Sequence, residues 1–273
     1  MKLSISNIAW LPKDRNKIYK FLNEEKIKGL EIAPKLLLHD IHDIFKLNKK
    51  ETTKHLNELK KHNLKLVSMQ SLLFEAKDCY LFKSIDQRNN FISHLSNTIK
   101  LAKKLGIKNL VFGSPKNRII PLNMKYEDAE KIAIKVFKKI GKIAKHNNVY
   151  LSIESNPQEY GTNFLNTIYQ TYDFVKKVRS KHIKIILDTG EILMNSENNE
   201  IDSIIKKRID LINHVHISEP YLKLIKNKNF VKKLIFTLNK YNYQKWVSIE
   251  MRSHKKNNYN NIFKVIKLVN SYF

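Results

Sequence analysis

Cysteine is almost absent from this sequence of 273 residues, which contains only Cys79. A single cysteine cannot form an internal disulfide, and it excludes zinc modules that need several cysteine ligands. Long apolar runs are absent too, because Lys or Asn interrupts every hydrophobic stretch before it reaches the roughly 18 residues that cross a bilayer. The first residues, MKLSISNIAWLPKD, lack the small-residue cleavage site of a signal peptide. We therefore expect a cytoplasmic protein with no membrane partner.

Arginine is also scarce, although the chain carries a formal net charge of +26. Only six of the 51 basic residues are Arg, which reads bases and phosphates better than Lys does. Lys, Asn and Ile are all abundant, and A/T-rich codons encode these three amino acids. The Lys residues are spread along the whole chain without a basic arm or an aromatic-interleaved patch. We therefore expect no nucleic-acid partner, although the charge can steer anionic substrates toward the protein.

The six glycines are scattered, and no Gly-rich phosphate-binding motif occurs. Asp188-Thr189-Gly190 matches the triplet of aspartic proteases, but it occurs once. A second copy would be needed for the carboxylate pair of those enzymes, so the sequence excludes that class.

Short β-like runs recur along the chain with turn or polar residues at their ends. They cover residues 2–10, 29–34, 64–70, 107–115, 149–155, 183–190, 212–220 and 246–252. Segments with apolar residues at helical spacing lie between them, such as Phe91, Leu95, Ile99 and Leu105. Eight such units in 273 residues average about 34 residues each, the size expected for a (β/α)8 TIM barrel. No linker or composition shift divides the chain, so we predict a single TIM-barrel domain over residues 1–273.

Alternation within the predicted strands places polar side chains on one face. Ser152 and Glu154 oppose the apolar residues of the strand at 149–155, and Ser248 and Glu250 do the same in the strand at 246–252. The apolar set is expected to pack under the helices, so the polar set points into the barrel. Barrel interiors usually contain branched apolar residues, and ionisable groups at strand ends therefore indicate a site.

Four such groups end consecutive strands and are spaced by 34, 28 and 34 residues. They are Glu154, Asp188, His216 and Glu250. Neighbouring carboxylates repel one another unless a cation or protons compensate their charge. Three carboxylates and one imidazole suit one divalent ion, Mn²⁺, Mg²⁺ or Co²⁺, with Zn²⁺ left open. Taken singly, each could instead cap a helix or pair with Lys.

The segments around these residues resemble a known family. IESNPQEYGTNFLNT (153–167), LDTG (187–190), HVHISEP (214–220) and SIEMR (248–252) are similar to the sugar phosphate isomerase/epimerase group of the xylose isomerase-like TIM barrels, which also includes the endonuclease IV branch. The resemblance implies that the same four residues are the metal ligands. It also implies that Glu154 and Glu250 act as the acid/base pair on opposite faces of a sugar, with His214 as a deeper supporting residue.

Two positions depart from the ketose 3-epimerases of this family. Glu191 stands where many of them carry His, and Leu222 stands where they carry Arg. Both family residues contact substrate, so we expect related chemistry on a changed substrate.

Further polar residues are expected around the barrel mouth. As substrate-binding residues we predict Trp10, Glu31, Gln70, Lys116, Arg118, Asn156, Glu191, Glu219 and Arg252. Arg118 and Arg252 could each hold an anionic group, while Trp10 could pack against a sugar face or serve in the core. Asn163 could contact the substrate or form the N-cap of a helix that begins at Phe164.

The functional expectation is a metal-dependent isomerase or epimerase that acts on a sugar or sugar phosphate through an enediolate. The alternative is an endonuclease IV-like repair enzyme, which needs three zinc ions and more histidines. The strands that end at Gln70 and Gly113 offer none at those positions. A barrel that only binds a partner is the third hypothesis, and monomer and homo-oligomer both stay open.

Overall fold

Eight parallel strands close into a barrel in which each strand pairs with its sequence neighbours and β1 pairs with β8. The structure, a computed structural model, describes residues 1–253 and 258–273. The strands are β1 (Lys2–Ser6), β2 (Gly29–Ile32), β3 (Lys65–Met69), β4 (Asn109–Phe112), β5 (Tyr150–Ile153), β6 (Ile183–Asp188), β7 (Ile212–Ile217) and β8 (Trp246–Ile249). The predicted (β/α)8 TIM barrel is therefore confirmed, with strands shorter than the predicted runs.

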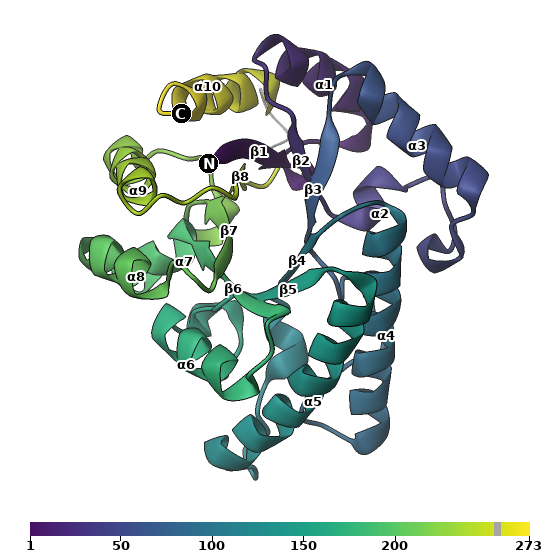
Figure 1. The fold of residues 1–273 in the computed structure, drawn as a ribbon, viewed down its shortest axis with the longest axis vertical. Helices are drawn as coiled ribbons and strands as arrows, with labels where there is room; N and C mark the ends of the chain where they lie inside the picture. The colour runs from purple at the N-terminus through teal and green to yellow at the C-terminus, as the bar shows by residue number, and fades with distance from the viewer. Residues whose placement is uncertain (254–257) are drawn as a thin grey trace.

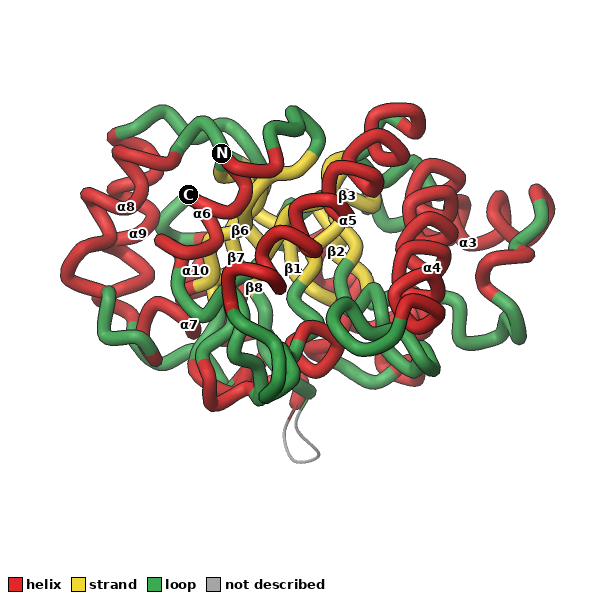
Figure 2. The backbone as a smooth tube through the Cα atoms, turned by 90° about the horizontal axis from the view of Figure 1, so that it is seen from below, coloured by secondary structure: helices red, strands yellow, loops and turns green. Residues whose placement is uncertain are grey.

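Helices surround this barrel on the outside (Figure 1). They are α1 (Arg15–Glu24), α2 (Pro34–Leu37), α3 (Lys49–Lys61), α4 (Ile85–Lys104), α5 (Tyr126–Asn147), α6 (Ile168–Val178), α7 (Thr189–Met194), α8 (Ile201–Arg208), α9 (Lys228–Lys240) and α10 (Asn258–Asn270). Figure 2 shows the strands at the centre, with the helices around them and both termini at one end of the barrel. Since β1 begins at Lys2, this is the end at which the strands start.

Local sequence signals begin several of these helices. In α3 and α4, Asn48 with Glu51 and Ser84 with Gln87 form reciprocal capping boxes that satisfy backbone N–H groups of the first turn. Thr167 caps α6. Asn163 is therefore not an N-cap, and its side chain instead bonds to the backbone N–H and C=O of Ile120.

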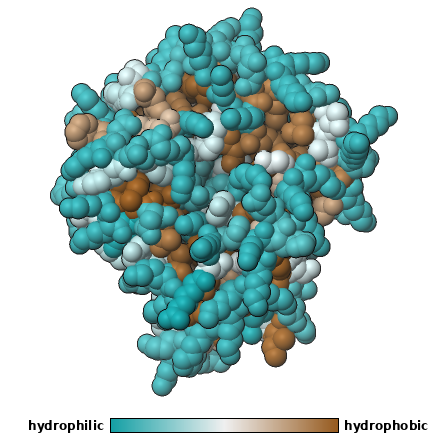
Figure 3. All heavy atoms as spheres, in the orientation of Figure 1, coloured by the Kyte–Doolittle hydropathy of each residue, from teal (hydrophilic) through white to brown (hydrophobic). Residues whose placement is uncertain are grey.

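The apolar core lies between the strands and the helices. Phe91, Leu95 and Ile99 of α4 are fully buried, as their spacing predicts. In α5, Ala133, Phe137 and Ile140 are buried, whereas Ile132 is partly exposed. The face of the molecule in Figure 3 is mostly hydrophilic, with apolar patches between. Within the described ranges, no helix is long and apolar enough to cross a membrane.

The interior of the barrel is polar. Ser4 and Ser248 lie 2.9 Å apart, oxygen to oxygen, and Ser152 donates to the side chain of Asn109. These residues are fully or almost fully buried. The alternation in the sequence predicted this inward polar face, and its hydrogen bonds offset the cost of removing the groups from water.

Candidate metal centre

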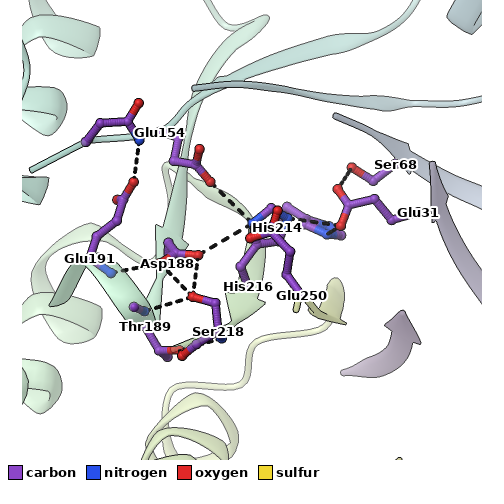
Figure 4. Close-up of polar contacts among 12 residues, drawn as sticks. Glu31, Ser68, Glu154, Asp188, Thr189, Glu191, His214, His216, Ser218 and Glu250 are labelled. Atoms are coloured by element: carbon purple, nitrogen blue, oxygen red, sulfur yellow. Dashed lines mark hydrogen bonds and ion pairs between the residues drawn. The ribbon is translucent and has the colours of Figure 1, made fainter. Parts of the chain in front are cut away.

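Four side chains converge at the end of the barrel where the strands finish. Glu154 and Glu250 directly follow β5 and β8, Asp188 ends β6, and His216 lies near the end of β7. Each offers one ligand atom, and these atoms all lie within 4.8 Å of one another (Figure 4). The structure therefore brings together the four residues predicted as metal ligands.

His216 occupies the middle of this group. Its Nδ1 atom lies 3.1 Å from Glu250 Oε2, 3.3 Å from Glu154 Oε1 and 3.6 Å from Asp188 Oδ2. Within the described part of the chain, this buried nitrogen has no hydrogen-bond partner. One imidazole nitrogen and three carboxylate oxygens are ligand atoms of the kinds that Mn²⁺, Mg²⁺, Co²⁺ and Zn²⁺ bind. The residues therefore fit a divalent metal ion.

The electrostatics of the group also favour a bound cation. Burial raises the pKa of Glu154 and raises that of Glu250 to about 7, since each carboxylate is removed from water and faces others. Burial alone would lower the pKa of His216, but Glu250 and Glu31 raise it well above its ordinary value. The cluster therefore stabilises positive charge, and a divalent ion supplies that charge more effectively than protons do.

Glu31 holds His216 from the side opposite the carboxylates. Its Oε2 atom lies 3.0 Å from His216 Nε2, and its Oε1 atom accepts a 2.7 Å hydrogen bond from Ser68 (Figure 4). A hydrogen bond from Nε2–H to Glu31 would leave the Nδ1 lone pair available to a cation held among the carboxylates. Glu31 is fully buried in the barrel below the mouth. Its carboxylate is therefore placed to orient His216, and Glu31, which was predicted to bind substrate, is not part of the cavity lining described below.

His214 lies deeper in the barrel. Its Nε2 atom is 3.6 Å from Glu31 Oε2, and its ring is nearly perpendicular to that of His216. Burial would raise the pKa of Glu31, but His216 and His214 lower it well below its ordinary value. The supporting position predicted for His214 agrees with this placement.

Asp188 is oriented by residues that the sequence reasoning missed. Its side chain caps α7 by accepting from the backbone N–H of Glu191, and the Ser218 hydroxyl lies 2.8 Å from both carboxylate oxygens. Ser218 is held in turn by the backbone N–H of Gly190. Asp188 thus has the capping role that was considered as an alternative and also lies in the cluster. The position of Ser218, two residues after His216 and on the same face, was the signal available in the sequence.

A cavity of about 440 Å³ opens above the four residues. Its lining includes Glu154, Asp188 and Glu250, and four of the predicted substrate-binding residues, Gln70, Asn156, Glu191 and Arg252. The other lining residues are Ile8, Ser71, Val111, Gly113, Ser114, Pro115, Tyr160, Ser218, Tyr221 and Leu222. Gly113 leaves room for the tip of Glu154, because a Cβ atom at this position would lie 2.3 Å from Glu154 Oε2.

Glu191 is a buried carboxyl at the wall of this cavity. It accepts hydrogen bonds from Ser155 Oγ at 2.8 Å and from Asn156 Nδ2 at 2.6 Å. Burial raises its pKa well above the ordinary value, and the charges of Glu154 and Asp188 raise it further. The position that departs from the ketose 3-epimerase pattern therefore presents a carboxyl group to the cavity.

The remaining predicted residues lie away from the cavity. Trp10 packs edge-on against Tyr19 in the core, and Lys116 is exposed. Arg118 is fully buried, donates to the backbone carbonyl of Glu154 and has its pKa lowered to about 10 by burial. Glu219 accepts from the backbone N–H groups of residues 226 and 227. Trp10 therefore belongs to the core, Arg118 and Glu219 bond to loop backbone, and Lys116 faces solvent.

Comparison with known proteins places the chain in a family. The sequence profile of the xylose isomerase-like TIM barrel family matches residues 21–269. A D-psicose 3-epimerase from Enterocloster bolteae is 33% identical over 87 residues, which cover 32% of this chain and only 28% of that protein.

Two solved structures share the fold over nearly the whole chain. A 3-keto-D-glucoside 4-epimerase from E. coli has a TM-score of 0.79 and 17% identity, covering 99% of both chains. A D-psicose 3-epimerase from Clostridium cellulolyticum H10 has a TM-score of 0.75 and 16% identity, covering 100% of this chain and 96% of that one. The closed barrel and the profile match lead to the same conclusion: the chain belongs to the xylose isomerase-like TIM barrel family.

Proposed function

We propose that this protein is a divalent-metal-dependent epimerase or isomerase that acts on a sugar or sugar phosphate. The observation that carries the proposal is the convergence of Glu154, Asp188, His216 and Glu250 beneath an open cavity. The sugar epimerases with the same fold, and the partial relative that is a D-psicose 3-epimerase, support the assignment of substrate class.

The chemistry follows from what these side chains can do. A divalent cation bound by the four residues would polarise the substrate carbonyl and stabilise negative charge on its oxygen. Glu154 or Glu250 removes the proton beside that carbonyl, which gives an enediolate. The other glutamate returns a proton, to the opposite face in an epimerisation or to the neighbouring carbon in an isomerisation. The two carboxylates come from β5 and β8, on different sides of the barrel, so each reaches the substrate from its own side.

The polar wall of the cavity suits a hydroxyl-rich substrate. Gln70 and Asn156 offer amide groups, and Glu191 offers a carboxyl. Arg252 lines the cavity, whereas Arg118 is buried behind Glu154. We therefore assign any contact with a phosphate group of the substrate to Arg252 and not to Arg118.

The test removes the two bases one at a time. The wild type, Glu154→Gln and Glu250→Gln are stripped with a chelator, reloaded with Mn²⁺, Mg²⁺, Co²⁺ or Zn²⁺, and assayed on free ketoses, ketose phosphates and keto-glucosides. We expect each variant to lose roughly 10²-fold or more in turnover, as usual for the loss of a general acid or base. Glu219→Gln, which removes a carboxylate outside the cavity, is the matched control and retains turnover.

Hydrogen exchange in deuterated water separates the two glutamates. A variant that retains proton removal but lacks proton return should exchange the substrate C–H hydrogen without forming product. Near-normal turnover of both variants on a substrate that the wild type converts would refute the two-base mechanism. Failure of the wild type to bind any divalent ion would refute the proposal as a whole.

A further inference from the structure

A second cavity lies at the opposite end of the barrel, where the strands begin. Its volume is about 540 Å³, and nothing in the proposed reaction uses it. Its lining consists of Lys65, Leu66, Val67, Gly106, Lys108, Asn109, Tyr150, Lys184, Asn213, His214, Gln244, Lys245 and Trp246. Four of these residues are lysines, and none of these lining residues is acidic.

The lysines lie on or just before four different strands around the barrel. Lys65 begins β3, Lys108 precedes β4, Lys184 lies in β6, and Lys245 precedes β8. Such a ring focuses positive potential on the space that it encloses. The same cavity wall carries the aromatic rings of Tyr150 and Trp246, and Lys65 Nζ lies 5.2 Å from the centre of the Trp246 ring.

The charges of these lysines are not neutralised by carboxylates. Lys184, Lys245 and Lys108 donate to backbone carbonyl oxygens at 3.1, 2.9 and 3.3 Å. None of the four forms an ion pair with a residue that the structure describes. Burial lowers the pKa of Lys245, and the charge of Lys184 lowers it further, while Asp210 partly offsets these effects. The cavity therefore holds excess positive charge that an anion would stabilise.

The inner wall of the cavity adds neutral donors. Asn213 donates one amide N–H to Asn109 at 2.7 Å, which leaves its second N–H available. His214 is fully buried behind this wall; its Nε2 atom faces Glu31 at 3.6 Å, and its Nδ1 atom has no hydrogen-bond partner in the described ranges of the chain. A buried polar atom without a partner costs free energy, so the unpartnered Nδ1 atom behind the basic cavity favours a hydrogen-bonding ligand there.

We propose that this cavity binds a small anion of the phosphate class, either inorganic phosphate or the phosphate group of a small metabolite. Ammonium, amide and imidazole groups are the donors that bind phosphate oxygens. The volume lies within the range of small-molecule sites and exceeds what one phosphate needs. A nucleic acid fits less well, because the lysines surround a recess within the barrel end and do not extend along a surface.

The test is titration of the full-length, metal-free protein with inorganic phosphate by calorimetry at constant ionic strength. Lys184→Gln/Lys245→Gln should weaken phosphate binding by roughly 10-fold or more, since two charged donors are lost. Lys138→Gln/Lys139→Gln removes the same charge from exposed positions on α5 and should leave binding unchanged. Arg252→Gln alters the other cavity, where Arg252 is assigned to a phosphate group of the substrate, and should leave phosphate binding at the lysine-lined cavity unchanged.

Further titrations test which ligand binds and whether it binds in this cavity. Asn213→Asp places a carboxylate at the inner wall and should abolish binding, with circular dichroism confirming the fold. Ribose 5-phosphate that binds more tightly than inorganic phosphate would support a metabolite, and equal affinity would support the free ion. The proposal is overturned if phosphate binds no better than chloride, if the α5 control weakens binding equally, or if Arg252→Gln abolishes it. It is also overturned if a short DNA duplex displaces phosphate and loses affinity in the same lysine variant.

Discussion

Removing the carboxylate that holds His216 should weaken metal binding without removing a catalytic group. Glu31→Gln keeps the size of the side chain and an oxygen that can accept from His216 Nε2, but it loses the negative charge. Glu31→Ala leaves that buried N–H without a partner. Because the 3.0 Å contact between Glu31 and His216 directs Nδ1 toward the carboxylates, both variants should loosen the ligand.

The expected magnitude follows from the geometry of this contact. Loss of such an outer partner typically lowers metal affinity by about 10- to 100-fold. That range corresponds to roughly 1.4 to 2.8 kcal/mol at 25 °C. The loss of metal affinity should be near the lower limit for Glu31→Gln, since an acceptor for His216 Nε2 remains. It should be near the upper limit for Glu31→Ala, since the buried position leaves no water to replace the carboxylate. Ser68→Ala, which removes the 2.7 Å bond to Glu31, should have a smaller effect of the same sign.

The assay is metal titration of the chelator-treated protein, followed by turnover at increasing metal concentration. A positioning role predicts that saturating metal restores most of the turnover of Glu31→Gln, whereas it cannot restore Glu154→Gln. Glu219→Gln serves as the control and should match the wild type. Unchanged metal affinity in both Glu31 variants would refute the reasoning, and so would loss of turnover that saturating metal does not reverse.

Three further outcomes are expected. Metal affinity, measured by titration calorimetry, should rise roughly 10-fold from pH 6 to pH 8. A cation must displace the proton of Glu250, whose pKa is raised to about 7. An affinity that does not change with pH would contradict this. Gly113→Ala should lower turnover by up to about 10²-fold with little change in melting temperature, because the new Cβ atom displaces the tip of Glu154. Turnover equal to that of the wild type would show that the position of Glu154 does not depend on Gly113. The protein should not cleave duplex DNA at abasic sites, since β3 and β4 are followed by Gln70 and Gly113; incision above a Glu154→Ala control would refute this.

The sequence was sufficient to predict the barrel because its periodicities were strong. Each strand carries inward polar and outward apolar residues, and the spacing of one unit recurs eight times. The limits of the elements were harder to predict. Residues 189–190 were assigned to a strand but begin α7, because Asp188 caps that helix with its own side chain.

The candidate site was predictable where the signal was local. Strand-end residues of ligand type could be placed at one end of the barrel by counting units. Contacts between distant strands could not be predicted in this way. The alternation shows which face of the sheet a side chain occupies, but it does not show which residue across the barrel it contacts. Glu31 is 185 residues from His216 in sequence, and nothing along the chain links them. Arg118 was expected in the mouth for its charge, yet its loop turns it inward to the carbonyl of Glu154.

The polar interior of the barrel explains how the His216 side chain can be held in one orientation. From His216, hydrogen bonds run through Glu31 and Ser68 to Asn109, which also accepts from Asn213. Branched apolar residues would fill the same space without desolvating polar groups, but they could not select the tautomer of His216. Glu31, Ser68 and Asn109 each have hydrogen-bond partners in this series, which offsets the cost of burial and restricts their rotamers. These hydrogen-bonded residues therefore give less hydrophobic packing than apolar residues would, but they fix the orientation of the His216 imidazole beneath the cavity.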